Sequence, residues 1–270
     1  MLELSKSRLN MSKWLVQKNF SKKLKLRNPI LLEGLPGIGN VGKIAIDYLI
    51  DNLKPELLYK IHSHMFPHSV FLNEDNCIEL PSVSIYNYKG KERDILLLTG
   101  DVQPIEEAAS YEFCEKILDF MEELSCKEII TLGGIGLPTE IKNPAVFGAV
   151  TDKTVLDKYK KYKGINFKPG QKIEAIVGAS GLLLGLAQLR NLKGISLLAE
   201  TYANQYHLGF KEAKVLLEKL QSILDIKLNL NELEKEINFS EKQRLSDLDN
   251  SEKLAKKFKP SFDKSIRYIG

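Results

Sequence analysis

The glycine-rich stretch at residues 29–50 constrains the fold more than any other part of the chain. It begins with the short apolar run Ile30–Leu32, which is typical of a strand buried on both faces. The turn formers that follow are Gly34, Pro36, Gly37, Gly39 and Gly42. After this predicted loop, apolar residues recur at helical spacing. A strand, a glycine loop and a helix make up the repeating unit of α/β sheets. We therefore expect an α/β fold, a single three-layered domain whose mostly parallel central sheet is flanked by helices.

Two phosphate-binding motifs overlap in this loop. Gly37, Gly39 and Gly42 have the spacing of the dinucleotide fingerprint G-x-G-x-x-G, and the seven residues from Gly37 also match the P-loop pattern G-x-x-x-x-G-K. The P-loop then requires a Ser or Thr hydroxyl for magnesium, but this chain has Ile44 at that position. An aliphatic side chain cannot coordinate a hard cation, so the pattern argues against a P-loop NTPase.

The dinucleotide interpretation needs an acidic residue at the end of the next strand, about twenty residues on, to hold the ribose. The next apolar stretch, Leu57–Ile61, is followed by His62 and Ser63, and no carboxylate stands there. Glycines in such a loop can also serve only to let a helix pack closely on a strand. We favour this structural interpretation, and we expect no cofactor.

Three glycine motifs together resemble one protein family. Gly34–Gly42 is similar to the signature of the proteasome-assembly-chaperone family, in its archaeal and bacterial branch. Two later parts of the chain resemble the same family in the same order: Gly133–Pro138 with Val146–Asp152, and Gly178–Gly185 with Leu197–Thr201. The similarity covers about residues 12–225, which is most of the chain.

The resemblance implies a non-enzymatic assembly chaperone or activator-like protein that binds the ring of proteasome α-subunits as a homo-oligomer. Members of the family end in a hydrophobic residue, a tyrosine and any residue, and this tail enters pockets between neighbouring α-subunits. The corresponding residues here are Ile266, Arg267, Tyr268, Ile269 and Gly270. Tyr268 is third from the end rather than second, and one extra residue moves the carboxylate by roughly 3.3–3.6 Å in an extended chain.

Composition sets the expected domains and compartment. Residues 1–11 are predicted to be a loose N-terminus, 12–229 an α/β core, and 230–270 a partly helical segment that ends in a mobile tail. The net charge of +4 does not favour nucleic acid as a partner. We expect neither a membrane span nor a signal peptide. Three cysteines without metal spacing are typical of reduced thiols in a cytoplasmic protein.

An enzyme remains the alternative. Gly133, Gly134 and Gly136 follow the predicted strand Ile129–Leu132, so a loop there and the Gly37 loop would flank one crevice at the carboxyl ends of the strands. Glu200 follows another predicted strand, where it would grip a ribose or a base, or bind a loop backbone. Such a site would suit a nucleoside- or nucleotide-binding enzyme of phosphorylase- or hydrolase-like activity. We find no convincing catalytic nucleophile, general base or metal cluster for it.

Two other candidate sites, a histidine metal site and a catalytic serine, are better explained by structural roles. His62 and His64 have the spacing of two ligands on one strand face, with His68 nearby, but further ligands are not visible, so we expect no metal site. Ser180 lies one position away from a nucleophile-elbow pattern and lacks the acid and histidine that should follow in order. We interpret Ser180 as the N-cap of an apolar helix.

Overall fold

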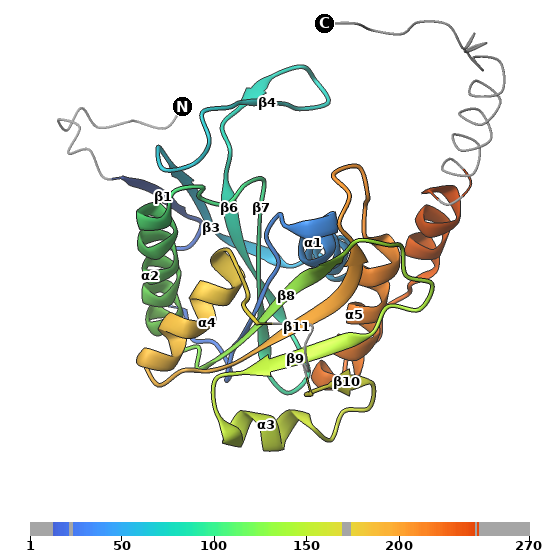
Figure 1. Ribbon diagram of the computed structural model, residues 1–270. Helices are drawn as coiled ribbons and strands as arrows, with labels where there is room; N and C mark the ends of the chain where they lie inside the picture. Colours follow the sequence, from blue (N-terminus) through green and yellow to red (C-terminus); the bar gives the residue numbers. More distant parts are fainter. Residues whose placement is uncertain (1–12, 22–23, 169–173, 241, 243–270) are drawn as a thin grey trace, which may run out of the picture. The chain divides into compact units, whose positions relative to one another are not determined.

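The computed structural model describes residues 13–21, 24–168, 174–240 and 242 (Figure 1). The chain divides after Asn229 into two units, which are described separately. The strands of the first unit are β1 (Trp14–Lys18), β2 (Ile30–Glu33), β3 (Glu56–Ser63), β4 (Phe71–Leu72), β5 (Ile78–Glu79), β6 (Val83–Lys89), β7 (Asp94–Gly100), β8 (Glu128–Leu137), β9 (Val146–Val150), β10 (Ile165–Asn166) and β11 (Lys193–Tyr202). Its helices are η1 (Ile38–Asn40), α1 (Val41–Leu53), α2 (Glu107–Glu123), α3 (Lys153–Tyr159), α4 (Ala179–Leu189) and α5 (Phe210–Leu224).

Nine strands form one mixed sheet in the order β1-β3-β6-β7-β2-β8-β11-β9-β10. The centre, β7-β2-β8-β11, is parallel, as the strand–loop–helix pattern predicts. The strands on the β1 side of this centre pair antiparallel, and β9 is antiparallel to β11. The α/β fold with a central sheet flanked by helices is confirmed. The sheet is mixed rather than mostly parallel, because tight connections such as that between β6 and β7 reverse the chain direction.

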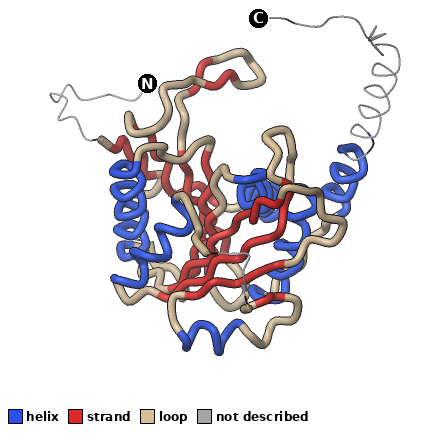
Figure 2. The backbone as a smooth tube through the Cα atoms, in the orientation of Figure 1, coloured by secondary structure: helices blue, strands red, loops and turns tan. Residues whose placement is uncertain are grey.

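Helices cover both faces of this sheet, which gives three layers (Figures 1 and 2). Helices α2 and α4 pack together on one face, and α1 and α5 pack together on the other. The strands β2 and β7 are buried along their whole length, as expected for central strands with helices on both sides. The core between the sheet and the α2–α4 layer includes Leu31, Leu96, Phe113, Ile117 and Leu183.

Two parts of the chain lie outside this arrangement of layers. Strands β4 and β5 form a separate two-stranded sheet that projects from the body in Figure 1. In the second unit, residues 231–240 are helical, within the segment that was expected to be partly helical. The predicted loose N-terminus and the predicted mobile tail lie outside the described residues. In the described part of the chain, no helix combines the length and apolar character needed to cross a membrane.

Candidate functional site

The glycine loop joins the end of β2 to the start of α1. Gly37 has an extended backbone, Gly39 has a φ of +63°, and the next residue, Asn40, has a φ of +51°. Two successive residues in the left-handed region form a sharp turn, which glycine adopts at low cost and asparagine more readily than most residues. The turn directs the N-terminus of α1 toward the carboxyl ends of the central strands.

Two of the motif glycines permit close packing between backbones. A Cβ at Gly34 would lie 2.1 Å from the carbonyl oxygen of Gly42, and a Cβ at Gly42 would lie 2.2 Å from the carbonyl oxygen of Leu132. Both distances are far inside van der Waals contact, and the obstructing atoms are backbone atoms that cannot rotate away. These glycines therefore bring the start of α1 directly onto β2 and β8. Gly37 differs, because a Cβ there would meet no atom closer than 4.0 Å.

The second glycine motif lies within a strand, which corrects the loop expected after Leu132. Gly133, Gly134 and Gly136 are part of β8, which continues to Leu137 because it pairs with β11 along its whole length. Gly134 again serves close packing, since a Cβ there would lie 2.7 Å from the carbonyl oxygen of Ile38. Of the two glycine motifs that border the cavity described next, one is therefore a loop and the other is part of a strand.

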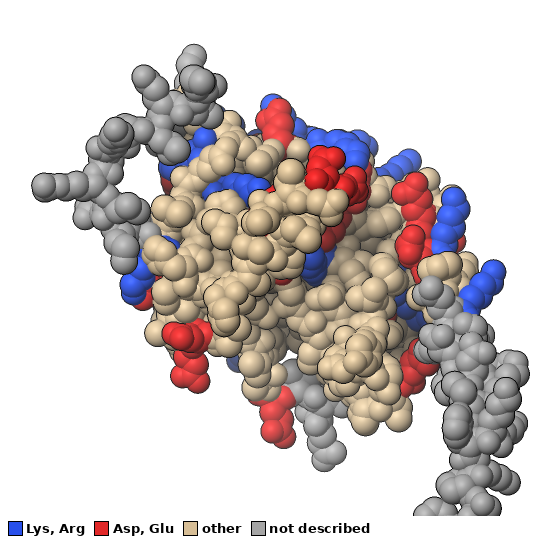
Figure 3. All heavy atoms as spheres, turned by 90° about the horizontal axis from the view of Figure 1, so that it is seen from above, with Lys and Arg blue, Asp and Glu red and all other residues tan. Residues whose placement is uncertain are grey.

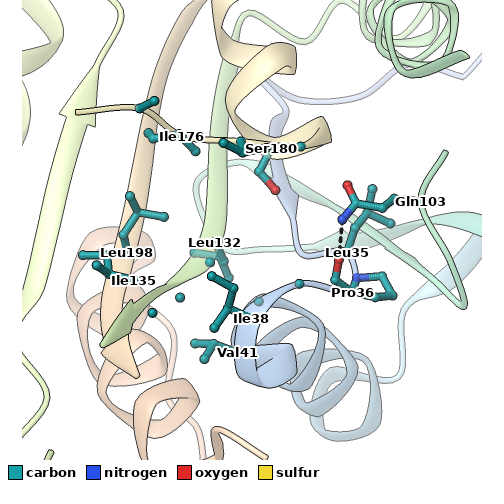
Figure 4. Close-up of a pocket in the computed structure, with 18 of the residues that line it drawn as sticks. Leu35, Pro36, Ile38, Val41, Gln103, Leu132, Ile135, Ile176, Ser180 and Leu198 are labelled. Carbon is teal, nitrogen blue, oxygen red and sulfur yellow. Dashed lines mark hydrogen bonds between the residues drawn. The ribbon is translucent and has the colours of Figure 1, made fainter. Parts of the chain in front are cut away.

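A cavity of about 410 Å³ opens at this edge of the sheet (Figure 4). Its walls come from the Pro36–Gly37 loop, the glycine part of β8, residues 174–178 and the first turn of α4. Most of the lining is aliphatic or glycine backbone, and Ile38, Leu132, Ile135 and Ile176 lie around it in Figure 4. The N-termini of α1 and α4 both border the cavity, so their helix dipoles favour negative charge there.

Gln103 and Ser180 supply polar side chains to the cavity wall. The Gln103 amide donates to the carbonyl oxygen of Pro36 at 2.7 Å, drawn as the dashed line in Figure 4, and its oxygen accepts from the backbone N–H of Ala179 at 3.1 Å. Gln103 thereby ties the glycine loop to the start of α4. Ser180 is not the N-cap, because Gly178 occupies that position and Ser180 lies inside the first turn.

The hydroxyl of Ser180 donates to Oε1 of Glu33, at 3.1 Å. Glu33 ends β2 and is only 1% exposed, and its Oε1 also accepts from the backbone N–H of Leu35. Its other carboxyl oxygen has no hydrogen-bond partner among the described residues. Burial raises the pKa of Glu33 to about 7, against the smaller lowering effect of its two hydrogen bonds. Sequence reasoning missed Glu33, because one acid at the end of an apolar run has no distinctive pattern.

Glu200 does not line this cavity. It lies inside β11, is 6% exposed, and its Oε2 accepts from the backbone N–H of Ala145 at 3.2 Å. This contact matches the second of the two roles expected for Glu200, the binding of a loop backbone. A nearby acid that was not predicted, Glu212, accepts from both Thr201 and the His207 ring at 3.0 Å. That cluster supports the loop that contains Gly39, since the N–H of Gly209 donates to the carbonyl oxygen of Gly39.

The structure describes the predicted histidine candidates but not the predicted tail. His62 contacts the carbonyl oxygen of Pro81 through Nδ1 at 2.9 Å. Across the described ranges, no three His, Cys, Asp or Glu side chains are grouped so that they could hold a metal ion. The candidate tail residues Ile266, Arg267, Tyr268, Ile269 and Gly270 lie outside the described residues. Chemically, the described site is a largely apolar cavity whose wall includes Ser180, and this serine is hydrogen-bonded to the buried Glu33 behind it.

Comparison with known proteins decides the family. The model of the PAC2 family matches residues 31–243, which is more than half of the chain. The chain belongs to the PAC2 family. The uncharacterized protein MJ1210 of Methanocaldococcus jannaschii is 31% identical over 247 residues, which cover 91% of this chain and 93% of the relative.

Solved structures of two archaeal proteins share this fold. The Pyrococcus furiosus protein PbaB, described as an archaeal proteasome activator, is 33% identical, with a TM-score of 0.81 over 88% of this chain and 100% of the solved one. PbaA of the same organism, described as an archaeal homolog of proteasome-assembly chaperone, is 23% identical with a TM-score of 0.71, over 92% of this chain and 97% of PbaA. The likeness to PbaA shows a shared fold alone. The resemblance found in the glycine motifs is thus confirmed.

Proposed function

We propose that this chain is a non-enzymatic proteasome assembly chaperone or activator that binds the ring of proteasome α-subunits. The observation that carries this proposal is the likeness to PbaB, an archaeal proteasome activator, which extends over the whole solved chain at 33% identity. Membership of the PAC2 family supports the same proposed function. In this proposal the protein acts in the cytoplasm, and it needs no cofactor, membrane or nucleic acid.

The proposed contact is made by Ile266, Arg267, Tyr268, Ile269 and Gly270 of several copies in a homo-oligomer. Each short tail binds weakly, and linking several of them makes the later binding events intramolecular, which raises the overall affinity. The tail has Tyr268 followed by Ile269, but Arg267 stands directly before the tyrosine, where the family pattern has a hydrophobic residue. In the family that the chain resembles, a lysine of the pocket holds the terminal carboxylate of the tail. Because Tyr268 is displaced by one position, Gly270 must bend for the carboxylate to reach that lysine, or the carboxylate must pair with another group.

Purified α-rings provide the test. We expect the full chain to co-sediment with α-rings, and the chain cut after Pro260 to lose this binding. Tyr268→Ala should weaken binding as well, whereas Ser265→Ala, three positions away in the same segment, serves as the matched control and should bind normally. Equal binding by the full and the shortened chain would remove the tail from the proposal.

One observation favours a second candidate function, a nucleoside- or nucleotide-binding enzyme of hydrolase- or phosphorylase-like activity. The Ser180 hydroxyl borders the 410 Å³ cavity and donates to Glu33, whose pKa of about 7 is in the range that suits a general base at neutral pH. A thermal-shift screen with nucleosides, nucleotides and phosphate tests this candidate. A positive result should disappear in Ser180→Ala, and no shift with any of these compounds would eliminate the enzyme.

A further inference from the structure

Exposed apolar side chains lie around the mouth of the cavity. Ile38 and Val177 both belong to its lining, and they are 48% and 92% exposed. Ile105 is 79% exposed and lies two residues from Gln103, which packs against Gly178. Figure 3, which looks down on the end of the body from which β4 projects in Figure 1, shows broad uncharged areas between scattered charged side chains. Apolar side chains grouped beside an apolar cavity indicate an interaction site.

The cavity itself suits one large uncharged side chain. An aliphatic cavity of about 150 Å³ is enough to hold a benzene molecule, so a cavity of 410 Å³ has room for an aromatic side chain. Among the described residues that line it, none is Lys, Arg or His, and the helix N-termini in its wall oppose a cation inside. Glu174 in the wall and Glu33 behind Ser180 oppose an anion.

The charged side chains around the cavity are all acidic. The segments that supply its polar and glycine-rich walls, together with the residues next to them, are 34–42, 101–107, 133–138 and 174–180. These segments contain no Lys or Arg, and their four acids are Asp101, Glu106, Glu107 and Glu174. No ion pair joins any of the four to another described residue. Because opposite charges steer and orient a partner, this rim fits a partner with Lys or Arg close to its apolar contact.

We propose that this cavity is a docking site for a protein segment that inserts one large apolar side chain and carries Lys or Arg on both sides of it. A large side chain in a desolvated pocket supplies much of the affinity of such contacts, and the charged rim fixes the orientation of the segment. The site lies on the core and uses neither the tail at residues 266–270 nor the α-ring. The core thereby binds a partner of its own.

Fluorescence anisotropy with a labelled peptide and the full chain provides the first test. The probe is an acetylated, amidated peptide with one phenylalanine between two pairs of lysines. It should bind, and more weakly as salt is added. Replacing its phenylalanine by glycine, or its lysines by glutamates, should weaken binding by about tenfold or more. No binding at millimolar peptide, or equal binding by the glycine peptide, would overturn the proposal.

A side chain at Gly37 should block the cavity. Its extended backbone is open to any residue, and a Cβ there would meet no atom closer than 4.0 Å, so Gly37→Leu should fold normally. This variant should bind the probe about tenfold more weakly or less, and Val177→Ser should weaken binding several-fold. Leu189→Ser is the matched control, because Leu189 is 78% exposed at the other end of α4. Circular dichroism should confirm the folds, and equal binding by folded Gly37→Leu would contradict the proposed site.

The acidic rim has its own test. Glu106→Gln combined with Glu174→Gln removes two of the four rim charges, so it should weaken binding of the lysine peptide and reduce its salt dependence. Glu74→Gln combined with Asp75→Asn is the matched control, because it removes two exposed acids from the turn between β4 and β5. Equal losses in the two double variants would mean that general charge attraction, and not the rim, holds the peptide.

A photoreactive probe locates the contact. With benzoylphenylalanine in place of phenylalanine, cross-links should map to the cavity lining, such as Ile176 and Leu198, and cross-links elsewhere would contradict the proposal. Another occupant would also overturn it. A second copy over the cavity should exclude the peptide and make the oligomer sensitive to Gly37→Leu. Stabilisation by a nucleoside without peptide binding would assign the cavity to the enzyme candidate.

None of these measurements uses the proteasome, so the two proposals can fail separately. Loss of α-ring binding with the peptide still bound would count against the proposed function alone. Failure of the peptide to bind, with α-rings still bound, would count against the docking site alone.

Discussion

Glu33 shows at the scale of a single residue how burial changes acid–base behaviour. Burial raises its pKa from the ordinary value of 4.5 to about 7. Below about pH 4.5 the carboxyl group is protonated in both the folded and the unfolded state, so its contribution to folding is complete. As the pH rises toward 7, the unfolded state gives up the proton more readily than the folded state does. The free energy of unfolding should therefore fall with rising pH, by about 3 kcal/mol for a shift of this size.

Glu33→Gln tests this directly, because glutamine is always neutral and similar in shape. Urea unfolding of wild type at pH 4.5 and pH 8 should show the loss of stability, and in the variant this pH dependence should be smaller by the same amount. At pH 8 the variant should be at least as stable as wild type. Glu174→Gln, which changes an exposed acid of the cavity wall, is the control and should follow the wild-type slope. Equal slopes for wild type and Glu33→Gln would mean that Glu33 titrates normally.

The glycines of the first motif should differ in their tolerance of a methyl group. Gly42→Ala should lower the free energy of unfolding by about 2 kcal/mol or more, because its Cβ would lie 2.2 Å from a backbone oxygen and α1 would have to move. Gly37→Ala should leave stability nearly unchanged, because its Cβ would point into open space. Thermal unfolding of the two variants side by side measures the difference, and equal losses would show that the loop, and not the packing of α1, sets the requirement.

At the scale of elements, structure that depends on neighbouring residues was easier to predict from the sequence than strand pairing between distant segments. The β2–loop–α1 unit was predictable because apolar periodicity and turn residues lie within a few positions of each other. The strand β8 was predicted to stop at Leu132, but it continues through Gly133, Gly134 and Gly136 because β11 supplies a partner along its length. Strand formation there depends on a segment about 65 residues away, so local propensity does not reveal it.

The candidate site was predictable only in part, for the same reason. The glycine walls of the cavity were found from the motifs, since glycines in sequence mark close backbone approaches. The Glu33–Ser180 pair joins residues 147 positions apart, and neither member has a local pattern that indicates the other. Ser180 looked like an N-cap because it precedes an apolar run. Gly178 takes the cap with a φ of +92°, which a serine side chain would make unfavourable.

The Gln103 side chain links the glycine loop to helix α4. Its side chain makes one hydrogen bond to the glycine loop and one to the start of α4, so Gln103→Ala should cost about 1–2 kcal/mol of stability. Gln188→Ala, which removes one exposed hydrogen bond on α4, is the matched control and should cost less. Hydrogen exchange should show faster opening at Ala179 in Gln103→Ala. Unchanged exchange there would mean that the bridge does not restrain α4.

At the scale of the whole molecule, the oligomer and the tails are expected to act together. If several tails bind one α-ring at once, the affinity of the oligomer should exceed that of a single tail by about 10²–10⁴-fold. A synthetic peptide of residues 261–270 keeps every tail residue but presents a single tail.

The peptide should therefore bind immobilised α-rings more weakly than the full chain does, by a factor in that range and through faster dissociation, although the tail itself is unchanged. Removing residues 261–270 from the full chain should abolish its binding. Joining two such peptides by a flexible linker should recover much of the difference in affinity, because it makes the second contact intramolecular. A peptide that binds α-rings as tightly as the full chain would show that one tail supplies the whole binding energy.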